Sequence, residues 1–228
     1  MAPAAGHGLE ALQRFARPRA DSQPRCRLCR HPIDPDDERH AHLVDLDERT
    51  ILCACETCRR LLAQPGAGGA RYRGIPDRTL AGAIFRLPDA RWAALGIPVR
   101  LAFIFFNSTL GRRFALYPSP AGAAESELPE EAWRALLAAG APAAEVEPDV
   151  EALLVHARPG DGGGGPGRDV ETFVVPIDAC YRLVGRVRRH WSGFHGGDAA
   201  WREIDQFFID LRARARPAAA ARAAEAAG

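Results

Sequence analysis

Five of the six cysteines lie close together, and this cluster constrains the fold more than any other feature. Cys26 and Cys29 form one Cys-x-x-Cys pair, Cys55 and Cys58 form a second, and Cys53 precedes the second pair. Each pair can wrap a tight turn around one cation, and four thiolates make the tetrahedral set that zinc prefers. We therefore predict a metal site of Cys26, Cys29, Cys55 and Cys58. Cys53 stays open as an alternative to Cys55, because strand alternation leaves its direction ambiguous.

Zinc in a structural role is the expected cofactor, because four cysteine ligands leave no open coordination position. Iron is the alternative, since four thiolates in two such turns also suit a single iron, as in rubredoxin-like sites. A disulfide scaffold is disfavoured, because five clustered cysteines are an odd number and a reducing compartment keeps thiols available for metal.

The expected compartment is the cytoplasm. Residues Met1–Gly8 lack the charged start and apolar stretch of a secretory signal. The apolar run Leu101–Phe106 is far too short to span a bilayer. The formal net charge of +1 produces no global field towards nucleic acid or an anionic membrane, so any such binding has to be local.

The cysteine-rich metal module is predicted over residues 23–66. An extended strand is predicted from His40 to Leu46, with His40, His42, Val44 and Leu46 pointing one way and the residues between them the other. A return strand over Thr50–Cys53 completes a β-hairpin. A short helix follows over Cys55–Gln64, ended by a Pro-Gly pair. A segment of about forty residues buries too little apolar surface to be stable alone, so the metal decides whether it folds.

The remaining chain predicts an α+β domain over residues 71–216, with a mainly antiparallel sheet and two C-terminal helices. Residues 1–22 are interpreted as an N-terminal helix and linker, and residues 217–228 as a disordered tail. The apolar strand Val99–Phe106 is expected at the centre of the domain. Asp178 and Asp198 are the expected N-caps of the two last helices.

Outside the cluster, few residues suggest chemistry. Cys180 lies on the apolar face of a predicted helix and is interpreted as a core cysteine. His195 lies in the connector 191–197, with no partner carboxylate or nucleophile in the pattern. Arg182, Arg186 and Arg189 form a stripe, either a solvated face or a surface that docks a partner. We therefore predict that the protein is not an enzyme.

Residues 26–62 show a Cys-x-x-Cys turn, a hairpin with histidines, and a second pair that opens a helix. This order resembles a treble-clef zinc finger, and in particular the scaffold of the HNH endonucleases. Those enzymes need a histidine base on the first strand and further asparagine and histidine residues on the helix side. His40 or His42 matches the first, but the helix offers Arg59, Arg60 and Leu61 instead. The resemblance implies the metal scaffold without the nuclease residues.

The cysteine cluster combined with two further segments, over 174–185 and 191–197, resembles an uncharacterised actinobacterial family of unknown function. Genes of that family are associated with those of nickel-iron hydrogenase subunits and maturation factors. The resemblance implies a pathway and not a mechanism.

Three functions follow as hypotheses. The first is a zinc-stabilised, non-catalytic accessory protein that binds a protein partner, such as a hydrogenase subunit or maturation factor, during hydrogenase expression, assembly or electron-transfer wiring. The second is a rubredoxin-like iron electron carrier. The third is a nucleic-acid-binding zinc module, because five arginines surround the cysteines. The near-zero net charge disfavours this third hypothesis. The five are Arg25, Arg27, Arg30, Arg59 and Arg60.

Overall fold

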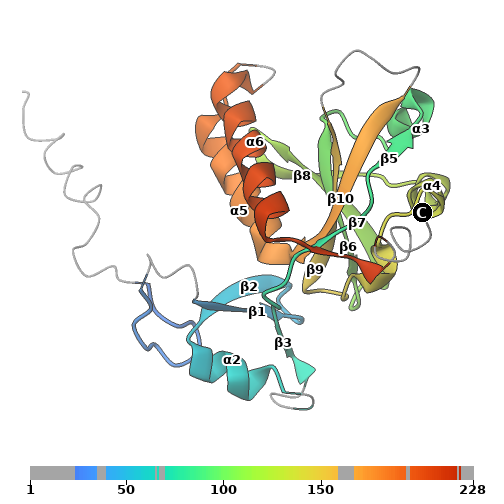
Figure 1. Cartoon of the computed structure of the whole chain (residues 1–228). Helices are drawn as coiled ribbons and strands as arrows, with labels where there is room; N and C mark the ends of the chain where they lie inside the picture. Colours follow the sequence, from blue (N-terminus) through green and yellow to red (C-terminus); the bar gives the residue numbers. More distant parts are fainter. Residues whose placement is uncertain are drawn as a thin grey trace, which may run out of the picture.

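A computed structural model describes residues 24–34, 40–64, 66, 70–158, 167–193, 196–219 and 221. The predicted N-terminal helix and linker over 1–22, the glycine-rich segment 159–166 and His195 lie outside the described residues. The described chain forms two sheets of mainly antiparallel strands with helices packed around them (Figure 1). The predicted α+β class is confirmed at this level.

The cysteine-rich segment is built on a three-stranded sheet with the order β2-β1-β3. β1 (Ala41–Asp45) and β2 (Thr50–Ala54) form the predicted hairpin, and α2 (Glu56–Leu62) follows β2. β3 (Tyr72–Gly74) pairs antiparallel with the other side of β1. The small sheet therefore includes a strand that the sequence pattern suggested for the following domain. We call residues 24–34, 40–64 and 70–75 the cysteine module.

The rest of the described chain, which we call the main domain, is built on an eight-stranded sheet. Its order is β11-β4-β10-β9-β6-β7-β8, with β5 also pairing with β10. Every pair is antiparallel except that of β11 with β4. The predicted apolar strand Val99–Phe106 corresponds to β6, which lies inside the sheet between β9 and β7. The strands are β4 (Leu80–Ala81), β5 (Phe85–Leu87), β6 (Leu101–Asn107), β7 (Arg112–Ser119), β8 (Gly122–Ser126), β9 (Glu151–Ala157), β10 (Arg168–Pro176) and β11 (Arg216–Pro217).

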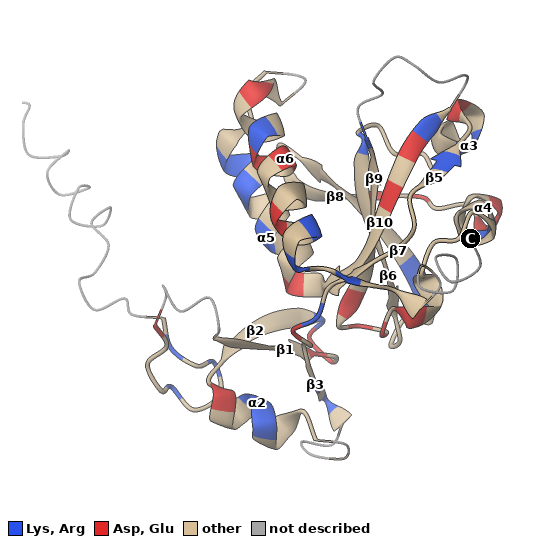
Figure 2. Cartoon of the chain, in the orientation of Figure 1, with Lys and Arg blue, Asp and Glu red and all other residues tan. Residues whose placement is uncertain are grey.

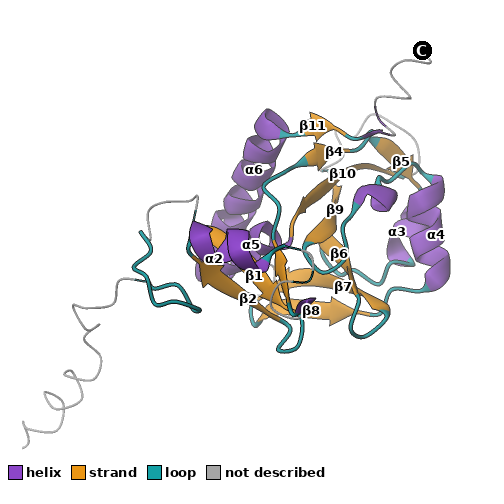
Figure 3. Cartoon of the chain, turned by 90° about the horizontal axis from the view of Figure 1, so that it is seen from below, coloured by secondary structure: helices purple, strands orange, loops and turns teal. Residues whose placement is uncertain are grey.

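Helices cover both faces of the large sheet (Figure 3). Side chains alternate along β9, all of whose residues are buried. Leu154 packs in a cluster with α5 and α6, and Leu153 packs in a second cluster with α3 and α4. None of the helices in the described part of the chain has the length and apolar character that a bilayer crossing requires. The helices are α3 (Asp89–Ala93), α4 (Glu130–Ala138), a short 3-10 turn (Ala143–Glu145), α5 (Ile177–His190) and α6 (Gly197–Arg214).

The two last helices begin differently from the prediction. Pro176 occupies the N-cap position of α5. Asp178 lies inside the first turn, where its carboxylate contacts His42 of the cysteine module. Gly196, with a φ of +89°, is the N-cap residue of α6, and no side chain caps that helix. The predicted caps Asp178 and Asp198 were therefore wrong. A Cβ at Gly196 would lie 3.5 Å from the ring of Trp191, so the Trp191 ring lies close to the backbone at this glycine.

The start of the predicted disordered tail is ordered. Arg216–Pro217 pair in parallel with β4, and Ala218 is fully buried. Residues 222–228 lie outside the described residues. The prediction that the chain is disordered from residue 217 was therefore wrong for residues 217–219.

The cysteine module and the main domain share a small apolar cluster. Val44 and Ile75 from the module are buried against Val150 and Ile177. His42 Nδ1 lies 2.8 Å from Asp178 Oδ2, and Arg73 Nη1 donates to the carbonyl oxygen of Pro148 at 3.0 Å. The module is thus held by burial and by polar contacts at once.

A buried polar network joins the large sheet to α6. His156 Nδ1 lies 2.8 Å from Glu171 Oε1, and Arg212 donates two hydrogen bonds to the same carboxylate at 3.0 and 2.7 Å. Burial raises the pKa of Glu171, but these hydrogen bonds outweigh it and hold the pKa at about 2, against an ordinary 4.5. The network keeps a buried carboxylate ionised because both of its oxygens are paired.

We expect Glu171→Gln to lower the free energy of unfolding at neutral pH by about 3 kcal/mol, because it leaves Arg212 and His156 without their carboxylate. Since the folded pKa of Glu171 lies below its ordinary 4.5, its stabilisation is complete above that pH and is lost as the pH falls towards 2. The difference between the two proteins, measured by urea denaturation, should therefore shrink below pH 4.5. A difference that does not change with pH would contradict this account.

Candidate metal centre

The first cysteine pair lies in a tight turn. The backbone N–H of Cys26 donates to the carbonyl of His31 at 2.8 Å, and the N–H of Arg30 donates to the carbonyl of Cys26 at 3.0 Å. Arg30 adopts a φ of +66°, which reverses the chain directly after Cys29. The turn brings both sulfurs of the pair to one side, as a metal-binding turn requires.

The second pair lies at the start of α2. Cys55 is the N-cap residue, and the backbone N–H of Cys58 donates to Cys55 Sγ at 3.5 Å. The hairpin ends at Ala54, so the chain passes from strand to helix within a single residue. This placement agrees with the prediction that both cysteines lie at the first turn of the helix.

The structure brings Cys26, Cys29, Cys55 and Cys58 together, with one sulfur from each and all four within 4.8 Å of one another. The sulfurs of Cys29 and Cys55 are 3.6 Å apart. Four sulfurs at the Zn–S distance in a tetrahedron would lie about 3.8 Å apart. No disulfide joins any of the six cysteines in the structure. The four sulfurs can hold a metal ion.

The environment of Cys26 favours the ionised, thiolate form of its side chain. Burial opposes its ionisation, but backbone N–H groups of Cys29, Cys55 and Leu28 donate to its sulfur and lower its pKa to about 6. Burial and the neighbouring sulfurs raise the pKa of Cys58. A thiolate at Cys26 would attract a cation. Binding of that cation would release protons from the neighbouring thiols.

Cys53 does not join the four. It pairs across the hairpin with His42, and cross-strand partners project from the same face of a sheet. One ligand atom each from His40, His42 and Cys53 lie within 4.8 Å of one another, as a separate group. Cys55, the preferred ligand over Cys53, is the one grouped with the other pair. Strand pairing decides this, and the spacing of the cysteines alone left it open.

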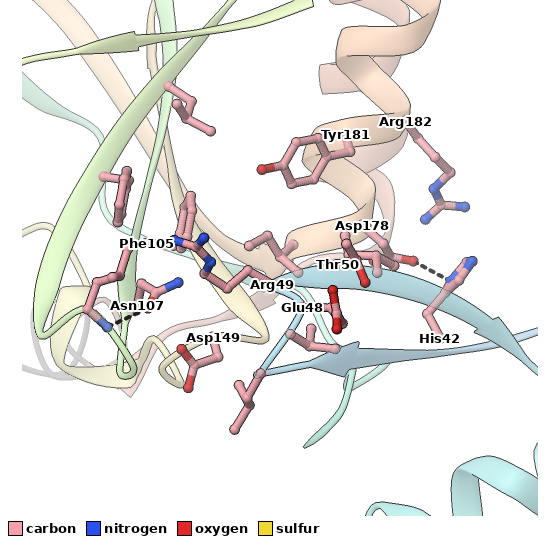
Figure 4. A pocket seen from close by; sticks show the side chains of 17 residues that line it. His42, Glu48, Arg49, Thr50, Phe105, Asn107, Asp149, Asp178, Tyr181 and Arg182 are labelled. Atoms are coloured by element: carbon pink, nitrogen blue, oxygen red, sulfur yellow. Dashed lines mark hydrogen bonds and ion pairs between the residues drawn. The ribbon is translucent and has the colours of Figure 1, made fainter. Parts of the chain in front are cut away.

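A cavity of about 810 Å³ opens between the hairpin and the main domain (Figure 4). Val44 and Ile51 contribute an apolar wall from the hairpin, and Phe105 contributes one from β6. Arg49 and Arg182 also line it, and Figure 4 shows His42 and Asp178 joined at its edge. We did not predict this cavity, because its walls come from strands and a helix that are distant in the sequence.

Cys180 is fully buried in the cluster beneath α5 and α6, and burial raises the pKa of its thiol. Its interpretation as a core cysteine agrees with this position. Asp178, by contrast, makes a contact with His42 that we did not predict. Burial opposes its ionisation, but His42 and Arg182 lower its pKa. In the sequence it was indistinguishable from a helix cap.

The chain belongs to a family of unknown function, DUF5947, whose family model matches residues 25–215. No curated protein and no solved structure matches the chain. Membership of a family without an assigned activity agrees with the expectation from the sequence, whereas the link to hydrogenase genes stays a prediction. The matched range spans the cysteine module and nearly all of the described main domain.

We expect Cys55→Ser to loosen the cysteine module, because it removes one of the four clustered sulfurs. Cys53→Ser is the matched control, since Cys53 lies outside the four. Hydrogen exchange of residues 24–34, which carry the first cysteine pair, should rise by at least about tenfold in Cys55→Ser and change little in the control. Equal exchange in the two variants would contradict the assignment of Cys55.

Proposed function

We propose that this DUF5947 protein is a non-catalytic accessory protein, in which a zinc-stabilised module and an α+β domain together bind a protein partner. The observation that supports it best is the set of four sulfurs within 4.8 Å, which would leave no coordination position for a substrate. The order of turn, hairpin and helix-opening pair supports a treble-clef-like module. In such a module Cys26, Cys29, Cys55 and Cys58 would hold the zinc.

The small core of the module supports a structural role for zinc. Its own core cluster has only four buried apolar residues in the described chain, while Val44 and Ile75 are buried against the main domain. The four are Cys26, Ile33, Leu43 and Ala54. No residue of α2 is buried. So little apolar burial does not offset the conformational entropy of ordering the segment, whereas zinc binding contributes about 10–16 kcal/mol.

The partner surface is proposed on and beside α5. The basic stripe on α5 forms no salt bridge with other described residues, and Figure 2 shows the basic residues of this helix in blue. The stripe consists of Arg182, Arg186 and Arg189. Leu110 and Tyr181, at 44% and 40% exposure, are exposed apolar side chains that line the adjacent cavity. Exposed apolar residues beside a basic stripe suit an acidic protein surface. The resemblance to a hydrogenase-associated family suggests a hydrogenase subunit or maturation factor as partner.

A second candidate is a rubredoxin-like iron electron carrier, favoured by the exposure of Cys29 at the surface of the four-sulfur group. The helix-opening second pair favours zinc instead, because rubredoxin-like sites use two turns. Protein purified in air should be colourless and hold zinc by elemental analysis. A red protein that holds iron would replace the accessory role by electron transfer.

Nucleic-acid binding has less support than the sequence suggested. Glu56 accepts hydrogen bonds from Arg59 at 2.8 and 2.6 Å and from Arg60 at 2.7 Å, so two of the five arginines near the cluster are paired internally. We expect no gel shift with duplex or single-stranded DNA at moderate salt. Strong binding that weakens steeply with added salt would favour the nucleic-acid hypothesis.

The partner proposal is tested with tagged full-length protein and purified hydrogenase subunits and maturation factors. Charge reversal of Arg182, Arg186 and Arg189 to glutamate should weaken binding at least about tenfold, because close charge pairs at interfaces contribute more than 1 kcal/mol each. Reversal of Arg91 and Arg134, on α3 and α4, is the matched control. If none of these proteins binds, and loss of the gene leaves hydrogenase activity unchanged, the accessory role fails.

A further inference from the structure

A second group of metal-ligating side chains lies on the hairpin, on the face opposite Leu43. His40 and His42 alternate along the chain, and His42 pairs with Cys53 across the hairpin. One ligand atom from each of the three lies within 4.8 Å of the others. The rings of His40 and His42 meet edge to face, with centroids 4.5 Å apart. All three residues are partly buried, which limits competition from water.

The main domain orients His42. Nδ1 of His42 lies 2.8 Å from Asp178 Oδ2, and the Asp178 side chain is only 13% exposed. A carboxylate that accepts a hydrogen bond from Nδ1–H fixes the ring and leaves the lone pair on Nε2 of a neutral imidazole. A histidine held by a carboxylate through one nitrogen is a common arrangement around bound metals. Oδ1 of Asp178 is buried and has no hydrogen-bond partner, so the pair with His42 is its principal polar contact in the described structure.

We propose that His40, His42 and Cys53 form a second metal site, separate from the four-cysteine group, with Asp178 positioning His42. Two imidazoles and one thiolate suit zinc. Three protein ligands leave a fourth position open, unlike the four-sulfur group. Of the three residues, His42 lines the 810 Å³ cavity, and in this proposal the open position faces that cavity.

The cavity indicates the class of ligand that would take the open position. Its lining is largely apolar, and its charged residues have both signs. Arg49 and Arg182 are basic, and Glu48, Asp149 and Asp178 are acidic. A small molecule with an apolar body and one metal-binding donor group would match this lining, with the donor group on the metal. This inference does not depend on the accessory role proposed above, because it concerns a different set of ligands.

The simpler interpretation is that His42 and Asp178 only fasten the module to the main domain. Cys53→Ser separates the two, because it removes a proposed ligand and leaves the His42–Asp178 contact intact. We expect full-length wild-type protein, equilibrated with zinc and freed of excess, to retain two zinc ions per chain. Cys53→Ser and His42→Ala should each retain one. His190→Asn, on exposed α5 surface, is the matched histidine control and should retain two.

Two further measurements refine the assignment. Asp178→Asn should weaken the second site by about 10–100-fold without affecting the first, since a positioning partner is removed and no ligand is lost. With cobalt in place of zinc, azide should alter the visible spectrum of the wild type and not that of Cys53→Ser, because only the second site has an open position.

The outcomes distinguish the two metal sites. One zinc per chain that is lost in Cys55→Ser and kept in Cys53→Ser would overturn the second site and leave the four-cysteine site intact. Two zinc ions retained in Cys53→Ser would also overturn it. A wild type that retains no zinc would overturn both. A cobalt spectrum unaffected by azide would overturn the open position.

Discussion

The shape of the cysteine module depends on four sulfurs that lie within 4.8 Å of one another. The apolar core beneath them is too small to order the hairpin and α2 against conformational entropy. Backbone N–H groups of the first turn already favour a thiolate at Cys26, so the protein supplies part of the charge that a cation needs. Binding a cation at these sulfurs would therefore be coupled to folding of the module.

The cysteine module packs against the main domain and forms one side of the cavity. β3 returns from the module towards the main domain, and Val44 and Ile75 pack against Val150 and Ile177. His42 of the hairpin contacts Asp178 of α5, and the cavity lies between the module and the main domain (Figure 4). A change at the four sulfurs would reach the cavity through β1, which carries Leu43 on its inner face and His42 on its outer face.

Much of the fold was readable from local pattern. The hairpin of the module, the hairpin of β6 and β7, and the apolar faces of α5 and α6 all follow from spacing that repeats over a few residues. Short strands such as β4 and β11 were not predicted, because two residues carry no periodicity. The helix caps were wrong because an aspartate near a helix start can equally pair with a distant group, as Asp178 does with His42.

The sequence by itself determined that two Cys-x-x-Cys turns would supply soft ligands, since that spacing is a local property of the chain. It also determined the apolar strands and helix faces of the main domain. Only the tertiary structure decided that Cys53 pairs with His42 and lies apart from the four sulfurs, because strand register sets which face a side chain takes. It also decided the cavity and the role of Asp178, since both depend on contacts between residues far apart in the chain.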